Sequence, residues 1–263
     1  MAITINHQTN DISATSGSIT IDGSSAGGLT GITDSASPNN TALGTNAADA
    51  ITTAADTVAI GYNALTNATS SPKNVAVGLF TLGNVTTGTG ANVGLGYQAG
   101  NAITTGPYNI AIGYRAMYAT SGTVTGNNNV AIGQSALNSV TSGENNFGAL
   151  LSAGTSITSG TDNLAIGANA LDALTTGNHN IALGKQSGTN LTNPTGNVGV
   201  GSYSLQDATT SPYNVALGYY SLADVTTGSN NVGIGQDTAG RLGAALTGDN
   251  NIAIGDTALA DAT

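Results

Sequence analysis

The chain repeats one short pattern of apolar, small and glycine positions about every seventeen residues. The pattern reads Asn-Val-Ala-Ile-Gly, and its last position is here called the glycine slot. Most neighbouring slots are 17 residues apart, with one step of 18 and two of 20. Such a period predicts a solenoid, in which each repeat is one rung that buries its apolar side chains by stacking on its neighbours. The slots are Gly44, Gly61, Gly78, Gly96, Gly113, Gly133, Leu150, Gly167, Gly184, Gly201, Gly218, Gly235 and Gly255.

Large aliphatic, small and large aliphatic residues alternate directly before each slot, and an alternation of period two predicts a short strand. We expect the Val and Ile side chains, three and one residues before the slot, to fill the interior of the coil. The residue two before the slot is Ala or Gly in all thirteen rungs, so it must face a close surface. That surface is the opposite arm of the same coil or another chain, and another chain is favoured. The alanines proposed for this subunit interface are Ala42, Ala59, Ala76, Ala111, Ala131, Ala165, Ala182, Ala216 and Ala253.

A second arm follows each glycine slot, where glycine turns the chain. A small residue stands three positions after the slot and is often followed by Leu or Met, as at Ala64–Leu65 and Ala116–Met117. We expect this segment to form a second strand, and a Thr-Gly or Ser-Gly corner such as Gly143 closes the rung. The sequence therefore predicts an all-β parallel β-roll of about 13 rungs over residues 39–263, preceded by a non-repeating segment over residues 1–38.

A column of asparagines accompanies the repeat, because Asn stands four residues before the slot in twelve of the thirteen rungs, with Thr57 as the exception. Stacked rungs place equivalent side chains about 4.8 Å apart. We expect the amides to bond to one another along the axis, as in other stacked β-structures.

The composition and charge of the chain argue against two classes of partner, nucleic acids and membranes. Only 7% of the residues are charged and the formal net charge is -10, with four basic residues in the chain. Four cations cannot neutralise a phosphate backbone, which argues against nucleic acid as a partner. No stretch approaches the roughly 20 apolar residues of a membrane span, so membrane insertion is not expected. The N-terminus lacks the basic and apolar regions of a signal peptide, which favours assembly in a cytoplasm.

The rung Asn129–Leu137, with sequence Asn-Val-Ala-Ile-Gly-Gln-Ser-Ala-Leu, resembles the head repeat of trimeric autotransporter adhesins. The segments 109–116, 163–170 and 251–258 match equally well. The resemblance implies a left-handed parallel β-roll assembled as a parallel homotrimer, with a role in surface display or adhesion. The rungs are longer than is usual in that family, and we expect no coiled-coil stalk or membrane anchor after them. Similar repeats are also found in structural proteins of tailed bacteriophages. The chain resembles this class of protein better than it resembles the adhesins.

We therefore expect a non-enzymatic virion protein of a tailed phage, made in the host cytoplasm, that forms a trimeric fibre, spike or capsid-decorating projection. Its N-terminal segment either docks on other virion proteins or caps the first rung. The first alternative is an adhesin on a bacterial cell surface. A second is an ice-binding solenoid, suggested by Thr-Thr pairs such as Thr86-Thr87 that lie at corners.

Five residues are candidates for contact with a receptor, a glycan or another partner. Tyr62, Tyr97 and Tyr114 follow their glycine slots and predict an aromatic stripe on one edge, although edge packing or trimer contact would also explain them. Arg115 and Arg241 lie in the two rungs that are three residues longer, with the extra residues near 121–124 and 241–244. Insertions in solenoids map to loops on one face, so each insertion is either a contact with a partner or a tolerated bulge.

No catalytic, cofactor or metal site is expected. The segment 94–99 imitates a dinucleotide-binding loop but repeats with the rung period, so it predicts a corner. His7 and His179 have no partners in the spacing of a metal site or a catalytic triad.

Overall fold

The structure, a computed structural model, describes residues 3–6, 11–14, 21–23, 26–29, 40–120, 122–239 and 247–259. These residues contain seventeen strands and no helix. The first four strands form two antiparallel pairs, β1 (Ile3–Asn6) with β2 (Asp11–Ala14) and β3 (Ile21–Gly23) with β4 (Ala26–Leu29). Both pairs lie within the non-repeating segment expected over residues 1–38.

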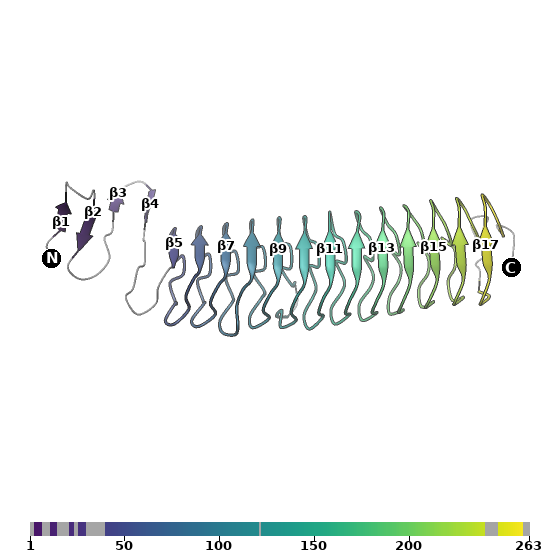
Figure 1. Cartoon of the computed structure of the whole chain (residues 1–263), viewed down its shortest axis with the longest axis horizontal. Coiled ribbons are helices and arrows are strands. Elements are labelled where there is room, and N and C mark those ends of the chain that lie inside the picture. The colour runs from purple at the N-terminus through teal and green to yellow at the C-terminus, as the bar shows by residue number, and fades with distance from the viewer. Residues whose placement is uncertain are drawn as a thin grey trace.

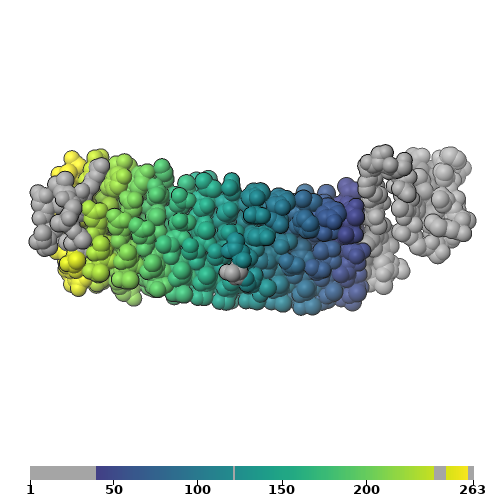
Figure 2. All heavy atoms as spheres, turned by 180° about the vertical axis from the view of Figure 1, so that it is seen from behind, coloured from purple at the N-terminus to yellow at the C-terminus, as the bar shows by residue number. Residues whose placement is uncertain are grey.

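The repeats form one parallel sheet of thirteen short strands in strict chain order (Figure 1). Figure 2 shows the rungs following one another along a rod in the order of the sequence. This confirms the β-roll and its seventeen-residue period. The strands are β5 (Thr41–Leu43), β6 (Val58–Ile60), β7 (Val75–Val77), β8 (Val93–Leu95), β9 (Ile110–Ile112), β10 (Val130–Ile132), β11 (Phe147–Ala149), β12 (Leu164–Ile166), β13 (Ile181–Leu183), β14 (Val198–Val200), β15 (Val215–Leu217), β16 (Val232–Ile234) and β17 (Ile252–Ile254).

Equivalent positions of neighbouring rungs pair directly. Ala131 is paired with Ala111 on one side and with Gly148 on the other, and no strand of this sheet shifts its register. A spacing of about 4.8 Å per rung gives the thirteen strands a length of roughly 58 Å.

The two faces of the sheet are the reverse of the expected ones. The central residue of each strand points into the roll, and Ala131 and Ala165 are both fully buried within the single chain. A Cβ atom added to Gly94, at the equivalent position, would lie 2.8 Å from Cγ of Leu82 on the opposite arm. The prediction that this column of alanines contacts another chain is therefore wrong, and the alternative surface, the opposite arm of the same coil, is the one observed. The column comprises Ala42, Ala59, Ala76, Ala111, Ala131, Ala165, Ala182, Ala216 and Ala253, none of them more than 2% exposed.

The expected second strand is also wrong, because the second arm is a series of turns with left-handed backbone at alternate residues. In one rung Asn63 and Leu65 have φ angles of 53° and 51°. The N–H of Asn63 donates to the carbonyl of Thr45 in the preceding rung, and that of Leu65 donates to the carbonyl of Thr81 in the next. This arm is thus hydrogen-bonded along the rod without forming β-strands. Leu also occurs in strands, so its presence at Leu65 does not indicate the left-handed turns.

Large and small residues compensate one another inside the roll in several rungs, although Leu171 and Leu174 are both large and fully buried. Where the second arm carries glycine, as at Gly154, the residue three positions later is large, here Ile157. A Cβ atom at Gly154 would lie 2.8 Å from Cδ2 of Leu137 in the preceding rung and 2.9 Å from Cδ1 of Ile157. Leu205 shows the reverse arrangement, since it precedes the small Ala208. The narrow core is therefore filled by side chains shared between rungs.

The glycine slot requires glycine for two reasons. Its φ angles are strongly positive, 131° at Gly133 and 140° at Gly184, and L side chains rarely adopt them. The slots also stack, so a Cβ atom at Gly184 would lie 2.6 Å from the carbonyl oxygen of Gly201. Leu150 occupies this slot with a φ of 82°, and strand β11 beside it keeps its register.

Candidate functional site

The outer face of the thirteen-stranded sheet is apolar along the whole rod. The residues one and three positions before each slot, here called the outward aliphatic columns, point away from the core and are half-buried or exposed. Ile132 and Ile234 are each 39% exposed, although both lie in the middle of strand pairings. The columns contain no charged residue, and Thr41 is the one polar residue in them. A sheet face in contact with water normally carries polar residues. This face is apolar and is therefore typical of a covered surface.

Of the residues expected to contact partners, the tyrosines do lie on the surface. Tyr62 packs edge-on against Phe80, with ring centroids 5.4 Å apart. Tyr97 and Tyr114 stack at 5.3 Å with an interplanar angle of 13°. Tyr97 and Tyr114 follow the slots of neighbouring rungs, whereas Leu79 stands at this position in the rung between Tyr62 and Tyr97. The expected stripe is therefore present as two separate ring pairs, and its partner role is still a prediction.

A second aromatic cluster lies farther along the rod. Tyr203 stacks on Tyr220 at 4.7 Å, and Tyr219 meets Tyr220 edge-on at 4.5 Å. The Nζ atom of Lys185 lies 5.6 Å from the ring centroid of Tyr203. Tyr219 directly follows its slot and is visible in the sequence pattern together with Tyr220, whereas Tyr203 stands two residues after its own slot and is not revealed by aligning the position after each slot.

The first long rung brings Arg115 against two tyrosines. Its guanidinium carbon lies 5.3 Å from the ring centroid of Tyr114 and 4.9 Å from that of Tyr118. Its Nε donates to Oε1 of Gln98 in the preceding rung at 2.9 Å. Arg115 forms no ion pair with the residues that the structure describes. Arg241, the corresponding candidate in the second long rung, lies outside the described residues.

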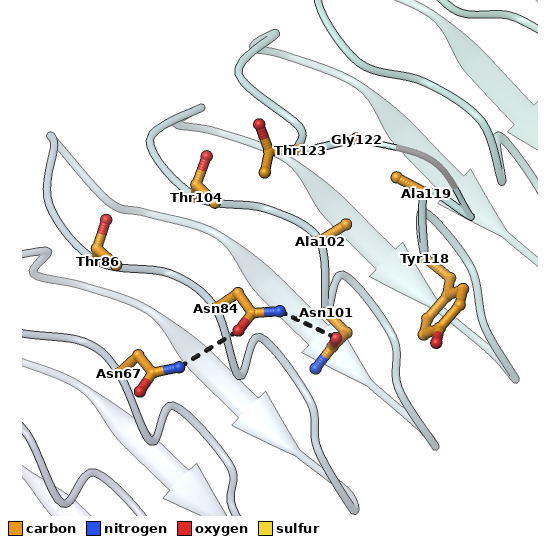
Figure 3. Close-up of a pocket in the computed structure, with 10 residues that line it drawn as sticks. All are labelled: Asn67, Asn84, Thr86, Asn101, Ala102, Thr104, Tyr118, Ala119, Gly122 and Thr123. Carbon is orange, nitrogen blue, oxygen red and sulfur yellow. Dashed lines mark hydrogen bonds between the residues drawn. The ribbon is translucent and has the colours of Figure 1, made fainter.

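The described extra residues of this rung, Gly122 and Thr123, lie in an exposed loop. Val124 is buried and bridges in parallel to Ile103, which stands seven positions after its slot. Val124 occupies the position equivalent to Ile103 but stands eleven residues after its own slot. The extra residues therefore lie between Ala119 and Val124. This location agrees with the position expected for the insertion. Beside the loop is a groove of about 460 Å³, lined by Asn67, Asn84, Thr86, Asn101, Ala102, Thr104, Tyr118, Ala119, Gly122 and Thr123 (Figure 3).

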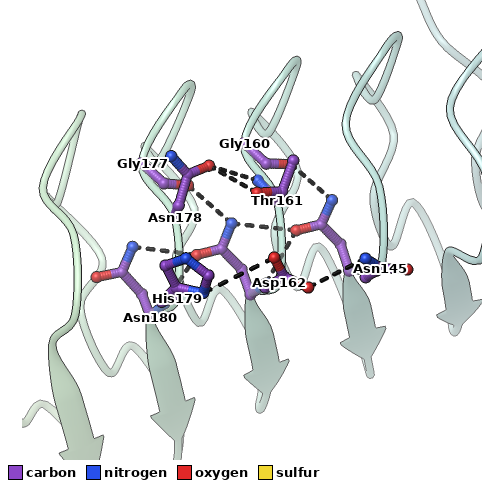
Figure 4. Close-up of polar contacts among 10 residues, drawn as sticks. Asn145, Gly160, Thr161, Asp162, Gly177, Asn178, His179 and Asn180 are labelled. Atoms are coloured by element: carbon purple, nitrogen blue, oxygen red, sulfur yellow. Dashed lines mark hydrogen bonds and ion pairs between the residues drawn. The ribbon is translucent and has the colours of Figure 1, made fainter.

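The expected asparagine column is confirmed, and it lies inside the roll. Asn163 accepts the backbone N–H of Asn180 at 3.0 Å, and its own Nδ2 donates to the carbonyl of Gly177 at 2.8 Å (Figure 4). Both asparagines are at most 2% exposed. The column is therefore structural and offers no surface to a ligand.

His179 lies on the surface above this column, 3.7 Å from Oδ2 of Asp162, which also accepts a hydrogen bond from Asn145 through Oδ1 (Figure 4). His7 lies outside the described residues. Within the described ranges no three His, Cys, Asp or Glu side chains are grouped as metal ligands would be. The segment 94–99 runs from strand β8 into a turn, as expected for a corner.

A row of threonines runs along the rod just before the second corner of each rung, where the sequence pattern indicates only Thr-Thr pairs. Thr141 donates its hydroxyl to the carbonyl of Thr158 at 3.1 Å, and Thr158 donates to that of Thr175 at 3.2 Å. These hydroxyls are engaged along the axis, which leaves them poorly arranged to order water and weakens the ice-binding alternative.

In the described part of the chain, no helix is long and apolar enough to cross a membrane. No family model matches the sequence, and comparisons with curated proteins and with solved structures give no match either.

Proposed function

We propose that this chain is a structural, non-enzymatic assembly protein whose rods associate lengthwise as a parallel homotrimer, and that the trimer is a fibre, spike or capsid-decorating projection of a tailed phage. The observation that carries the proposal is the pair of outward aliphatic columns, which run along all thirteen strands without a charge. Display and reach are what a rod of stacked rungs offers.

Association of several chains would cover this apolar face. An isolated rod exposes side chains such as Ile181 and Val200, each 36% exposed, in two continuous rows. Soluble monomers rarely expose contiguous apolar patches of more than a few hundred Å². A parallel arrangement matches rung to rung, because every rod has the same spacing, and closed rotational symmetry ends the assembly without free faces. The number three follows from the resemblance to the head repeats of trimeric adhesins.

The phage assignment is tested by locating the protein. Gold-labelled antibody against this chain, applied to purified virions, is expected to mark a fibre, spike or capsid projection in electron micrographs. Absence of label from every particle would overturn the phage assignment. Labelling of intact bacterial cells, together with cleavage of the chain there by added protease, would instead support the surface-adhesin alternative.

A further inference from the structure

The groove beside the long rung has two facing rows of polar side chains. Asn67, Asn84 and Asn101 form one row, and Thr86, Thr104 and Thr123 form the other (Figure 3). Each row takes one residue from each of three successive rungs, although Asn101 and Thr123 do not stand at the repeat positions of the other members of their rows. The groove therefore presents three amides opposite three hydroxyls.

These groups retain hydrogen-bonding capacity. Nδ2 of Asn67 donates to Oδ1 of Asn84 at 3.3 Å, and Nδ2 of Asn84 donates to Oδ1 of Asn101 at 3.2 Å. Each bond uses one of the two N–H groups of its amide, so one N–H per side chain is left for a ligand. The hydroxyls of Thr86 and Thr123 form no hydrogen bond with a described residue. The amide row is thus held in place by its own bonds while still able to bind.

Tyr118 and the loop residues Gly122 and Thr123 lie at one end of the groove. The guanidinium of Arg115 packs against the ring of Tyr118, and Gln98 fixes that guanidinium through Nε. Tyr118 is therefore a restrained aromatic ring beside a row of donors and acceptors. Rigid aromatic rings bind ligands at a low cost in conformational entropy.

This combination selects among ligand classes. A peptide strand needs unpaired backbone at a sheet edge, and the amides and hydroxyls of this groove are side chains of stacked rungs. A lipid chain needs an apolar lining, and the one described large apolar surface here is the ring of Tyr118. The net charge of -10 opposes nucleic acid. An oligosaccharide offers hydroxyls that both donate and accept, and ring faces that pack on tyrosine.

We propose that this groove is a binding site for a linear oligosaccharide, with Tyr118 packing on one sugar ring and the row Asn67–Asn84–Asn101 bonding to hydroxyls of the following units. The lining residues belong to the arm that packs across the core from the strands. A trimer formed through the outward aliphatic columns would therefore leave the groove open. The inference rests on the proposed function, a phage projection built for display and reach, and adds a ligand class to it.

The test uses the purified full chain on an array of bacterial surface polysaccharides and of maltohexaose, cellohexaose and chitohexaose. At least one glycan is expected to bind, and Tyr118→Ala and Asn84→Ala are each expected to weaken that binding by about tenfold or more. Tyr213→Ala, which removes another exposed tyrosine in a distant rung, serves as the matched control and should bind like the unaltered chain. Circular dichroism melts show whether each variant keeps its roll.

No binding to any glycan on the array would overturn the inference, as would equal binding by Tyr118→Ala and the unaltered chain. If Asn84→Ala unfolds, Asn84→Thr, which keeps a polar side chain without the amide, replaces it. The outcome is independent of the particle experiment. Glycan binding by a chain absent from virions would refute the phage assignment alone, and a labelled virion with no glycan binding would refute the groove alone.

Discussion

Asn146 donates its backbone N–H to Oδ1 of Asn129 at 3.0 Å, across two rungs of the roll. The side chain of Asn129 also donates through Nδ2 to the carbonyl of Gly143 at 2.8 Å. One buried amide therefore connects its own rung both to the start of the next strand and to the corner before it. Repeated along the rod, this connection makes the asparagine column a continuous internal brace.

Replacing Asn129 with Ala should destabilise the roll by about 2–4 kcal/mol, because the N–H of Asn146 and the carbonyl of Gly143 would be buried without partners. Thermal and urea unfolding of the variant would measure the loss. Asn127→Ala is the control, since the side chain of Asn127 makes no hydrogen bond with a described residue. Equal losses in the two variants would show that the column is not a brace.

Thr57 interrupts this column. Its N–H and its hydroxyl both donate to Oδ1 of Asn40, at 3.0 and 2.8 Å, and the backbone N–H of Asn74 in the next rung has no partner among the described residues. Thr57→Asn supplies an acceptor for that N–H and should raise the stability by about 1 kcal/mol, seen as a higher melting temperature. Thr57→Val, which supplies no acceptor, should lower it. A variant Thr57→Asn that melts below the natural chain would contradict the explanation.

Leu150 has a φ of 82° in a slot otherwise occupied by glycine, and its side chain is 57% exposed. Leu150→Gly should leave the melting temperature unchanged or raise it, because relief of about 1 kcal/mol of backbone strain offsets the greater chain entropy of glycine. Gly184→Ala should be strongly destabilising, since its Cβ atom would lie 2.6 Å from the carbonyl of Gly201. A drop of several degrees for Leu150→Gly would instead identify Leu150 as a packed contact.

Asp172 is half-buried, and burial raises the pKa of its carboxyl above the ordinary 3.8. A raised pKa means that the folded state binds a proton more readily than the unfolded chain. The charged form therefore costs stability at neutral pH, and the cost disappears as the pH falls through the raised pKa to below 3.8. Asp172→Asn should melt above the natural chain at neutral pH, and the difference should vanish in acid. A difference that persists or grows in acid would contradict this cause.

The period of the fold could be predicted from the sequence, because twelve equivalent glycines and twelve equivalent asparagines make the stacking register unambiguous. The direction of the two strand faces could not. The alternation in Val-Ala-Ile does not tell whether the large or the small side chains point inward. The usual preference for large residues inside a core favoured the large ones, and that choice was wrong. The roll is so narrow that Leu82 of the opposite arm already fills the space beside Gly94.

The second arm and the groove depend on features that alternation does not encode. Leu65 has a left-handed backbone, a conformation that apolar residues seldom adopt, so the Leu position resembled a strand. The insertion before Val124 could be located by counting, but the side chains that face it, such as Asn67 and Tyr118, come from four separate rungs. Their meeting requires the stacking geometry.

Two polar substitutions in the outward aliphatic columns, Ile132→Gln with Ile234→Gln, should dissociate the assembly at low concentration while leaving the roll folded, because both side chains point away from the core. Leu151→Gln is the control, since Leu151 is 47% exposed but lies outside these columns. Light scattering and circular dichroism separate dissociation from unfolding. If the double variant unfolds instead of dissociating, these isoleucines stabilise the single chain.

The assembly claim is tested most directly by sedimentation velocity of the unaltered chain over a wide range of concentrations. We expect one species with three times the chain mass of 25.6 kDa and the frictional ratio of a rod. A monomer at all concentrations would contradict the proposal that the outward aliphatic columns are a subunit interface, and a stable dimer would contradict the trimer.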